Sequence, residues 1–231
     1  MDERSNVFIS GADRGVGFAL CEQFAAHGYH VFAGQFMPQW KELEQLGKKY
    51  PEQITCIGLD VSDTESVRRA KEQTAACCEK LDILVNCAGI AKDDSREGLK
   101  ATLNVNVFGA MRMTESFLPL MEGGRKRLCF VSSEAGCVTL LHRKDGYAYC
   151  GSKTVMNMMI RLMFNELHGK GFTFRVYHPG WVRSYMMGEK AKEGNFEPEE
   201  SAEAAYGQFV SDRSYEDVLL MTDVKGEAWP F

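Results

Sequence analysis

Apolar residues in this chain fall into short runs that alternate with longer, amphipathic runs. The short runs predict seven strands, at residues 6–10, 29–33, 53–59, 81–86, 127–132, 172–178 and 217–221. The longer runs carry apolar residues at helical spacing and predict six helices, at residues 16–26, 40–50, 62–79, 99–121, 147–167 and 198–210. Strands that alternate with helices predict a doubly wound α/β fold, a three-layer sandwich around a mostly parallel, seven-stranded sheet.

The length and composition fit one globular domain over residues 1–231. Apolar residues make up 45% of the chain and charged residues 26%, so the chain can bury a core and disorder is not expected. No repeat, linker or low-complexity segment interrupts the pattern. No run approaches the ~18 apolar residues that a membrane helix needs, so we expect no membrane partner.

Charge and cysteine usage narrow the functional classes further. The net charge of −5 disfavours sequence-independent binding to nucleic acid, which needs a cationic surface. The acidic start lacks the apolar stretch of a secretory signal, and the eight cysteines form no C-x-x-C pair. We therefore expect reduced thiols and a cytoplasmic location. The five histidines show no paired ligand spacing, so we expect no metal site.

A glycine-rich turn at residues 11–17 joins the first predicted strand to the first predicted helix. Gly11, Gly15 and Gly17 would let the backbone approach a pyrophosphate closely. The helix that follows would offer free N–H groups and the positive end of its dipole to that anion. A tight strand–helix turn with no ligand also uses glycines, but the strand before it and the helix after it favour a nucleotide site.

Two further strand ends carry candidate ligand contacts. Asp60 ends the third predicted strand, where a carboxylate could accept a hydrogen bond from an adenine amino group. The alternative is a helix N-cap, a role for which Ser62 competes. The fourth strand ends in Asn86, Cys87, Ala88 and Gly89, which are small enough for the backbone to run beside a ligand or simply to turn.

Tyr149 and Lys153 lie four residues apart and therefore on one face of a predicted helix. A phenol has an ordinary pKa of about 10, and a neighbouring ammonium lowers it. Such a tyrosine can exchange a proton with a carbonyl or an alcohol near neutral pH. Ser133 ends the fifth strand, where its hydroxyl could donate to a carbonyl oxygen. An exposed helix pair is the alternative for the Tyr–Lys spacing.

Taken together, these motifs resemble the short-chain dehydrogenase/reductase family over nearly the whole chain. They occur in the family's order, and the chain's ending resembles the small C-factor-like members. The matching segments are residues 11–17, Asp60-Val61, 86–89, 106–109, 132–136, 149–153, Pro179-Gly180, 178–184 and 226–231.

The resemblance implies a single Rossmann-fold domain with a catalytic tetrad. Tyr149 would be the general acid or base, and Lys153 would lower the phenol's pKa and hold the nicotinamide ribose. Ser133 would polarise the carbonyl, and Asn106 would hold a water in a proton relay. The implied cofactor-binding residues are Gly11, Arg14, Gly15, Val16, Gly17, Asp60, Val61, Asn86, Ala88, Gly89, Tyr149, Lys153, Pro179, Gly180, Val182 and Ser184.

The residues favour NADP(H) over NAD(H) as cofactor. A preference for NAD usually needs an acidic residue after the second strand, and residues 33–37 contain none. Arg14 supplies a base for a 2′-phosphate. Asp13 stands where many relatives have serine, and no second arginine follows the strand; both oppose the preference.

The chain departs from the family pattern around the expected substrate site. The interval between Ser133 and Tyr149 is longer than usual, and the extra segment at 137–147 should lie at the substrate mouth. The basic residues of this segment would attract an acidic substrate. The alternative is that they form a solvated loop tip. The short stretch from Ser184 to Pro198 predicts an open site with a small lid.

The sequence therefore predicts an NAD(P)(H)-dependent oxidoreductase that interconverts a carbonyl and an alcohol of a small molecule. The alternative is a nucleotide-binding regulator of C-factor type with little turnover. A sugar epimerase or dehydratase would need a larger carboxyl-terminal domain, and an enoyl reductase would space its tyrosine and lysine further apart. Apolar residues on more than one face of the helices at 99–121 and 147–167 predict a homodimer or homotetramer, unless their methionines only fill the core.

Overall fold

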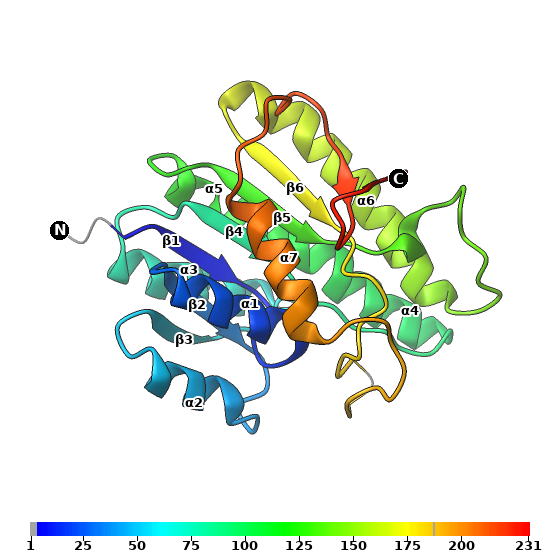
Figure 1. The fold of residues 1–231 in the computed structure, drawn as a ribbon, viewed down its shortest axis with the longest axis horizontal. Coiled ribbons are helices and arrows are strands. Elements are labelled where there is room, and N and C mark those ends of the chain that lie inside the picture. Colours follow the sequence, from blue (N-terminus) through cyan, green and yellow to red (C-terminus); the bar gives the residue numbers. More distant parts are fainter. Residues whose placement is uncertain (1–3, 187) are drawn as a thin grey trace.

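A computed structural model describes residues 4–186 and 188–231. Eight strands of these residues form one sheet in the order β3-β2-β1-β4-β5-β6-β7-β8 (Figure 1). The strands are β1 (Asn6–Ile9), β2 (His30–Gln35), β3 (Ile54–Gly58), β4 (Ile83–Asn86), β5 (Arg127–Val131), β6 (Thr173–Tyr177), β7 (Met221–Thr222) and β8 (Ala228–Trp229). All neighbours pair in parallel except β7 and β8. The doubly wound α/β fold class is thus confirmed.

Helices cover both faces of the sheet because successive side chains of a strand point to opposite faces. Val7 and Ile9 pack in one core cluster with residues of α1, α2 and α7, whereas Phe8 packs in the other with residues of α3, α5 and α6. The helices are α1 (Gly15–Ala26), α2 (Glu42–Lys49), α3 (Thr64–Cys77), α4 (Arg96–Leu103), α5 (Ala110–Met121), α6 (Tyr147–Leu167) and α7 (Pro198–Val210). None of the described helices has the length and apolarity that crossing a bilayer requires.

Two predicted elements differ from the structure. The helix predicted at 99–121 is α4 and α5 joined by a π-helical turn at Asn104–Gly109, which widens the helix where side chains of the turn bind neighbouring segments. The last predicted strand, 217–221, lies at Met221–Thr222 as β7, because residues 214–217 form turns. The chain then reverses and adds β8, so the predicted count of seven strands was one too few.

The expectation about the acidic start of the chain rests mostly on residues 1–3, which lie outside the described residues. All eight cysteines lie in the described part of the chain and are free thiols. The same part contains no group of three or more His, Cys, Asp or Glu side chains that could bind a metal ion.

Candidate active site

The predicted site residues gather where parallel strands end at one edge of the sheet. The glycine turn follows β1, residues 86–89 end β4, Ser133 follows β5, and residues 179–184 follow β6. Helix α6 runs alongside and carries Tyr149 and Lys153 in its first two turns. In doubly wound sheets this edge is where ligands bind.

The glycine turn is packed so closely that two of its glycines allow no side chain. A Cβ on Gly11, whose φ is +69°, would lie 2.7 Å from the Cα of Ala88. A Cβ on Gly17 would lie 2.1 Å from the carbonyl oxygen of Gly11. Helix α1 begins at Gly15 with no acidic residue in its first turn and no side-chain cap from Arg14. The free N–H groups of this turn suit an anionic ligand.

Asp13 has a structural role that the sequence did not reveal. Its buried carboxylate accepts hydrogen bonds from the N–H groups of Phe36 (3.1 Å) and Met37 (2.8 Å), which follow β2. It thereby fastens this loop to the glycine turn. Arg14 reaches the same loop: Nη1 lies 3.1 Å from the sulfur of Met37, and the guanidinium carbon lies 4.9 Å from the centroid of the Trp40 ring. A cation therefore stands directly beside the end of β2.

The residues predicted after β3 are mostly engaged within the protein. Oδ1 of Asp60 accepts from the N–H (2.8 Å) and the hydroxyl (2.7 Å) of Ser62. The N-cap of α3 is Asp63, so neither Asp60 nor Ser62 has that role. Val61 is buried in the core, where a Cβ on Gly109 would lie 2.8 Å from its Cγ2.

Asn86, at the end of β4, keeps one polar atom unpaired. Its Nδ2 donates to Thr114 (3.4 Å), whereas its buried Oδ1 has no hydrogen-bond partner among the described residues. The next two N–H groups, of Cys87 and Ala88, donate to the hydroxyl of Ser10. These bonds hold the β4 end against the residue that precedes the glycine turn.

Asn106 binds protein groups with both ends of its amide. Its Oδ1 accepts from the N–H of Ile90 (2.8 Å), and its Nδ2 donates to the carbonyl of Ile90 (2.9 Å) and to the hydroxyl of Ser152 (2.9 Å). The side chain therefore joins the β4 end to α6. Since Ser152 precedes Lys153, Asn106 helps to place the lysine.

Lys153 is 4% exposed and follows Tyr149 by one helical turn. Its Nζ donates to the carbonyl of Val131 (2.9 Å) and lies 5.7 Å from the centroid of the Tyr149 ring. Burial lowers the pKa of Lys153 to about 8. Burial also raises the pKa of Tyr149 to about 12, although a hydrogen bond with Ser133 works in the other direction. The lowered phenol pKa that the lysine predicts is thus not found, because desolvation dominates at both groups.

The segment after β6 folds back on itself near the same edge. Gly180 has a φ of +74°, and a Cβ there would lie 2.7 Å from the Phe196 ring. Val182 forms an isolated parallel bridge with Phe196, and the N–H of Ser184 donates to the carbonyl of Val182 (2.7 Å). Pro179 lies just before this loop and accepts through its carbonyl from Ser201 of α7 (2.9 Å).

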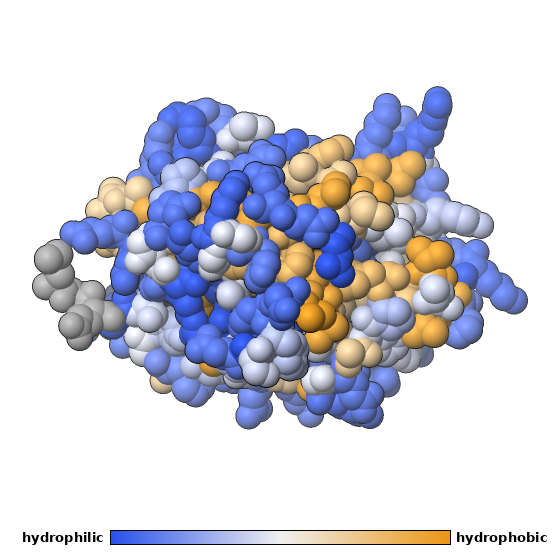
Figure 2. Space-filling model, turned by 90° about the horizontal axis from the view of Figure 1, so that it is seen from above, coloured by the Kyte–Doolittle hydropathy of each residue, from blue (hydrophilic) through white to orange (hydrophobic). Residues whose placement is uncertain are grey.

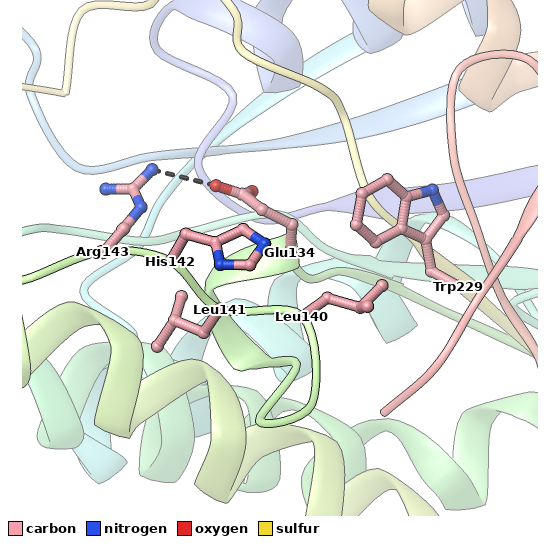
Figure 3. A pocket seen from close by; sticks show the side chains of 6 residues that line it. All are labelled: Glu134, Leu140, Leu141, His142, Arg143 and Trp229. Atoms are coloured by element: carbon pink, nitrogen blue, oxygen red, sulfur yellow. Dashed lines mark hydrogen bonds and ion pairs between the residues drawn. The ribbon is translucent and has the colours of Figure 1, made fainter.

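A cavity of about 560 Å³ opens beside Glu134, the residue after Ser133 (Figure 3). Its walls combine apolar and aromatic side chains with the ion pair of Glu134 and Arg143. The lining residues are Glu134, Leu140, Leu141, His142, Arg143 and Trp229. Residues 140–143 of the 137–147 segment thus line a cavity, and Arg143 is paired with Glu134 (2.9 Å) rather than free.

Sequence reasoning missed Glu134, His178 and Trp229. The rings of His178 and Trp229 meet edge to face, with centroids 5.0 Å apart. Only their positions in the sequence could have indicated the first two. Glu134 directly follows Ser133, and His178 directly precedes Pro179. Trp229 reaches the cavity only because β8 returns to the sheet, which no local pattern indicates.

Comparison with known proteins identifies similar chains and their family. A family model described as short chain dehydrogenase matches residues 5–195. Human retinol dehydrogenase 16 is 31% identical over 192 residues, which are 80% of this chain and 59% of that protein; the chain thus spans less than two thirds of this relative. The C-signal of Myxococcus xanthus is 33% identical over 125 residues, 51% of this chain and 75% of that protein. An alcohol dehydrogenase from Thermococcus sibiricus complexed with 5-hydroxy-NADP has 25% identity and a TM-score of 0.82, covering 95% of this chain and 96% of that one.

The fold and the family match define an NAD(P)-dependent oxidoreductase of the Rossmann-fold class. The chain belongs to the short-chain dehydrogenase family, and the resemblance seen in its ordered motifs is confirmed.

Proposed function

We propose that this protein interconverts a carbonyl and an alcohol by hydride transfer, with Tyr149 as the general acid or base. The observation that carries the proposal is the placement of Tyr149 and Lys153 beside the carboxyl end of β5. Nζ of Lys153 lies 5.7 Å from the centroid of the Tyr149 ring and donates to the carbonyl of Val131, two residues before Ser133. The phenol of Tyr149 would protonate a carbonyl oxygen bound at this edge of the sheet.

The glycine turn and the strand ends fit a dinucleotide, whose nicotinamide would supply or accept the hydride. The free N–H groups of α1 would bind the pyrophosphate of the dinucleotide. The unpaired Oδ1 of Asn86 would accept a hydrogen bond from another part of the dinucleotide or from an ordered water. Lys153 uses one N–H for Val131 and has two more to donate to ribose hydroxyls. Asn106 would support Lys153 through Ser152 and could extend a proton relay only through its main chain, since its amide is occupied.

In the reducing direction Tyr149 would donate its phenolic proton to the carbonyl oxygen as the hydride reaches the carbon. A pKa of about 12 keeps this phenol protonated at neutral pH, which favours its action as an acid. Oxidation would need the phenolate and should become faster as the pH rises. The direct test is to follow NADPH and NADH oxidation with a panel of aldehydes and ketones, from pH 6 to pH 9.

The similarity to C-signal supports a second candidate function, in which the protein binds a nucleotide and acts in signalling with little turnover. Calorimetric titration with NADPH and NADH separates the two. Tight binding without turnover on any carbonyl in the panel would favour the signalling function. Tight binding with turnover that depends on Tyr149 supports the oxidoreductase.

We also propose that NADP(H) is the preferred cofactor, because Arg14 stands beside the loop after β2 and no acid follows that strand. Arg14→Ala should weaken NADPH binding by roughly tenfold, since a hydrogen bond between charged groups is lost, and NADH binding by less. Calorimetry with both cofactors measures the difference. Lys48→Ala on exposed α2 is the control, and an equal loss for both cofactors in the Arg14 variant would remove the preference.

The third part of the proposal is a homodimer or homotetramer in which α5 and α6 form the interface. Val155, Met158 and Leu162 are exposed on α6, and Phe108 is exposed just before α5. Figure 2 looks down on the upper side of Figure 1, along which α6 lies, and shows hydrophobic residues gathered there between hydrophilic ones. Contiguous apolar surface of this kind marks an interface.

Leu162→Glu should therefore convert the assembly to monomers, because a carboxylate would be buried without a partner. Light scattering measures the mass and separates a dimer from a tetramer. Val218→Glu places the same charge at an exposed valine in a turn and should change nothing. A parent protein with the monomer's mass of 25.9 kDa at all concentrations would contradict the interface.

A further inference from the structure

A second cavity, of about 520 Å³, is lined by none of the predicted catalytic or cofactor-binding residues. Its walls come from α7, from the segment at 211–215, and from β7 and the connection between β7 and β8. These parts of the chain are coloured orange to red in Figure 1. The volume of the cavity lies within the range of small-molecule sites, roughly 300–1,000 Å³.

Small residues on α7 keep this space open. Ala204, Gly207 and Gln208 lie on one face of the helix, and Ser211 follows at its C-terminal end. A Cβ on Gly207 would meet no atom of another segment within 4 Å. A longer side chain at this position would therefore extend into the cavity without a clash.

The arginines beside this cavity outnumber the carboxylates. Asp212 pairs with Arg125 (2.7 Å) and with Arg127 (2.9 Å). Glu216 pairs with Arg175 (2.5 Å) and with Arg127 (3.5 Å). Each carboxylate thus already serves two guanidinium groups, and a further arginine of this group has to find its partner elsewhere.

Arg213 is that further arginine. It is half-buried, lines the cavity and forms no ion pair with any described residue. Its guanidinium carries five N–H donors and makes one hydrogen bond, from Nη2 to Oγ1 of Thr222 (3.4 Å). Thr222 donates to Oε1 of Gln208, whose Nε2 donates to the carbonyl of Asp223 (2.7 Å). This chain of bonds holds the guanidinium at the cavity wall and leaves most of its donors for a ligand.

The positive charge of Arg213 is incompletely balanced. Glu216 accepts a hydrogen bond from the main-chain N–H of Arg213 (3.0 Å), but its carboxylate is paired with Arg175. Burial lowers the pKa of Arg213, and the neighbouring charge of Arg175 lowers it further. An anion in the cavity would offset both the desolvation and the repulsion.

Lys225 adds a second cation to the wall, from the connection between β7 and β8. The acid nearest to it in sequence, Asp223, is engaged within that connection. The Asp223 carboxylate accepts from the N–H groups of Lys225 (2.9 Å) and Glu227 (2.9 Å) and from Nε1 of Trp229 (3.1 Å). No Asp or Glu is among the described residues that line the cavity. Two cations without an acid therefore line one hollow.

We propose that this second cavity binds a small phosphorylated molecule, with its phosphate group held by Arg213 and Lys225. A guanidinium fork matches the oxygens of a phosphate, and a multiply charged anion gains most from two cations. In the cavity of Figure 3, by contrast, Glu134 neutralises Arg143, so the same ligand is not expected there. Binding at the second cavity does not depend on the proposed oxidoreductase activity.

The test is a titration of the full chain with inorganic phosphate, followed in an assigned amide proton–nitrogen NMR spectrum at constant ionic strength. The signals of Gly207 and Gly226 report the second cavity, whereas those of Gly15 and Gly17 report the glycine turn. The two anion sites are therefore observed separately. We expect saturable shifts at Gly207 and Gly226. Arg213→Gln should weaken this binding about tenfold, since charge-assisted hydrogen bonds are lost.

Gly207→Leu is a second variant, which leaves both cations in place. Its side chain would occupy the cavity, so the Gly226 signal should no longer respond to phosphate, whereas Gly207→Ala should retain binding. Arg161→Gln is the control for charge alone. Arg161 lies against the rings of Phe164 (5.6 Å) and Phe231 (5.7 Å) on α6 and forms no ion pair within the described chain. The Arg161→Gln protein should bind phosphate as the parent does.

Three results would overturn the proposal. They are equal shifts with chloride at the same ionic strength, shifts confined to Gly15 and Gly17, and parental affinity in the Arg213→Gln protein. Circular dichroism reports folding throughout, and Gly207→Leu decides by itself if Arg213→Gln does not fold. Absence of carbonyl turnover or of NADPH binding would count against the proposed function and leave the phosphate result standing.

Discussion

Tyr149→Phe is expected to slow NADPH-dependent carbonyl reduction by about 10²–10⁴-fold while leaving NADPH binding nearly unchanged. The substitution removes the hydroxyl that would donate the proton and keeps the ring, so the packing of α6 is retained. Ser133 cannot replace it, because its hydrogen is engaged by Glu134. Initial rates at 340 nm and calorimetric titration measure the two properties on the same preparation.

Tyr147→Phe is the matched control for this experiment. Tyr147 lies two residues earlier on the same helix and is 75% exposed, so its hydroxyl faces away from Ser133 and Lys153. We expect parental rates and parental binding. Comparable turnover in the Tyr149→Phe and Tyr147→Phe proteins would contradict the role of Tyr149 as acid.

Elements with a strong local pattern could be predicted from the sequence. The strands and helices follow from alternation and helical spacing, and the glycine turn follows from residues within seven positions of one another. Tyr149 and Lys153 were likewise found because one helical turn separates them. Each of these signals is complete within a short stretch of chain.

Features that depend on distant partners could not be predicted. Asp13 departs from the family pattern, and its reason appears only when residues 36 and 37 fold against it. Glu134 and Arg143 are close in sequence, but nothing local shows that the carboxylate also takes the Ser133 hydrogen. The raised pKa of Tyr149 depends on burial, which a spacing of four residues does not report.

Two buried arginines of the sheet also depend on partners that are distant in the sequence. Their substitution has the largest expected effect on stability. Arg127 on β5 and Arg175 on β6 are each 1% exposed. Arg175 binds both carboxylate oxygens of Glu216, through Nη1 (2.7 Å) and Nη2 (2.5 Å), and donates to the carbonyls of Gln208 (3.1 Å) and Ser211 (2.6 Å). These carbonyls lie at the end of α7, where the helix leaves its last acceptors unpaired.

Arg175→Met should therefore lower the free energy of unfolding by about 3–5 kcal/mol, since it removes the buried bidentate partner of Glu216 and the side-chain donor to the carbonyl of Gln208. Urea denaturation measures the loss. Arg68→Ala is the control: Arg68 bonds Glu65 and Glu72 on the outer face of α3, but it is 55% exposed, and water replaces its contacts. The unfolding midpoint of that protein should stay nearly the same. Similar losses in the two proteins would mean that the number of ion pairs, and not their burial, determines how much each arginine contributes to stability.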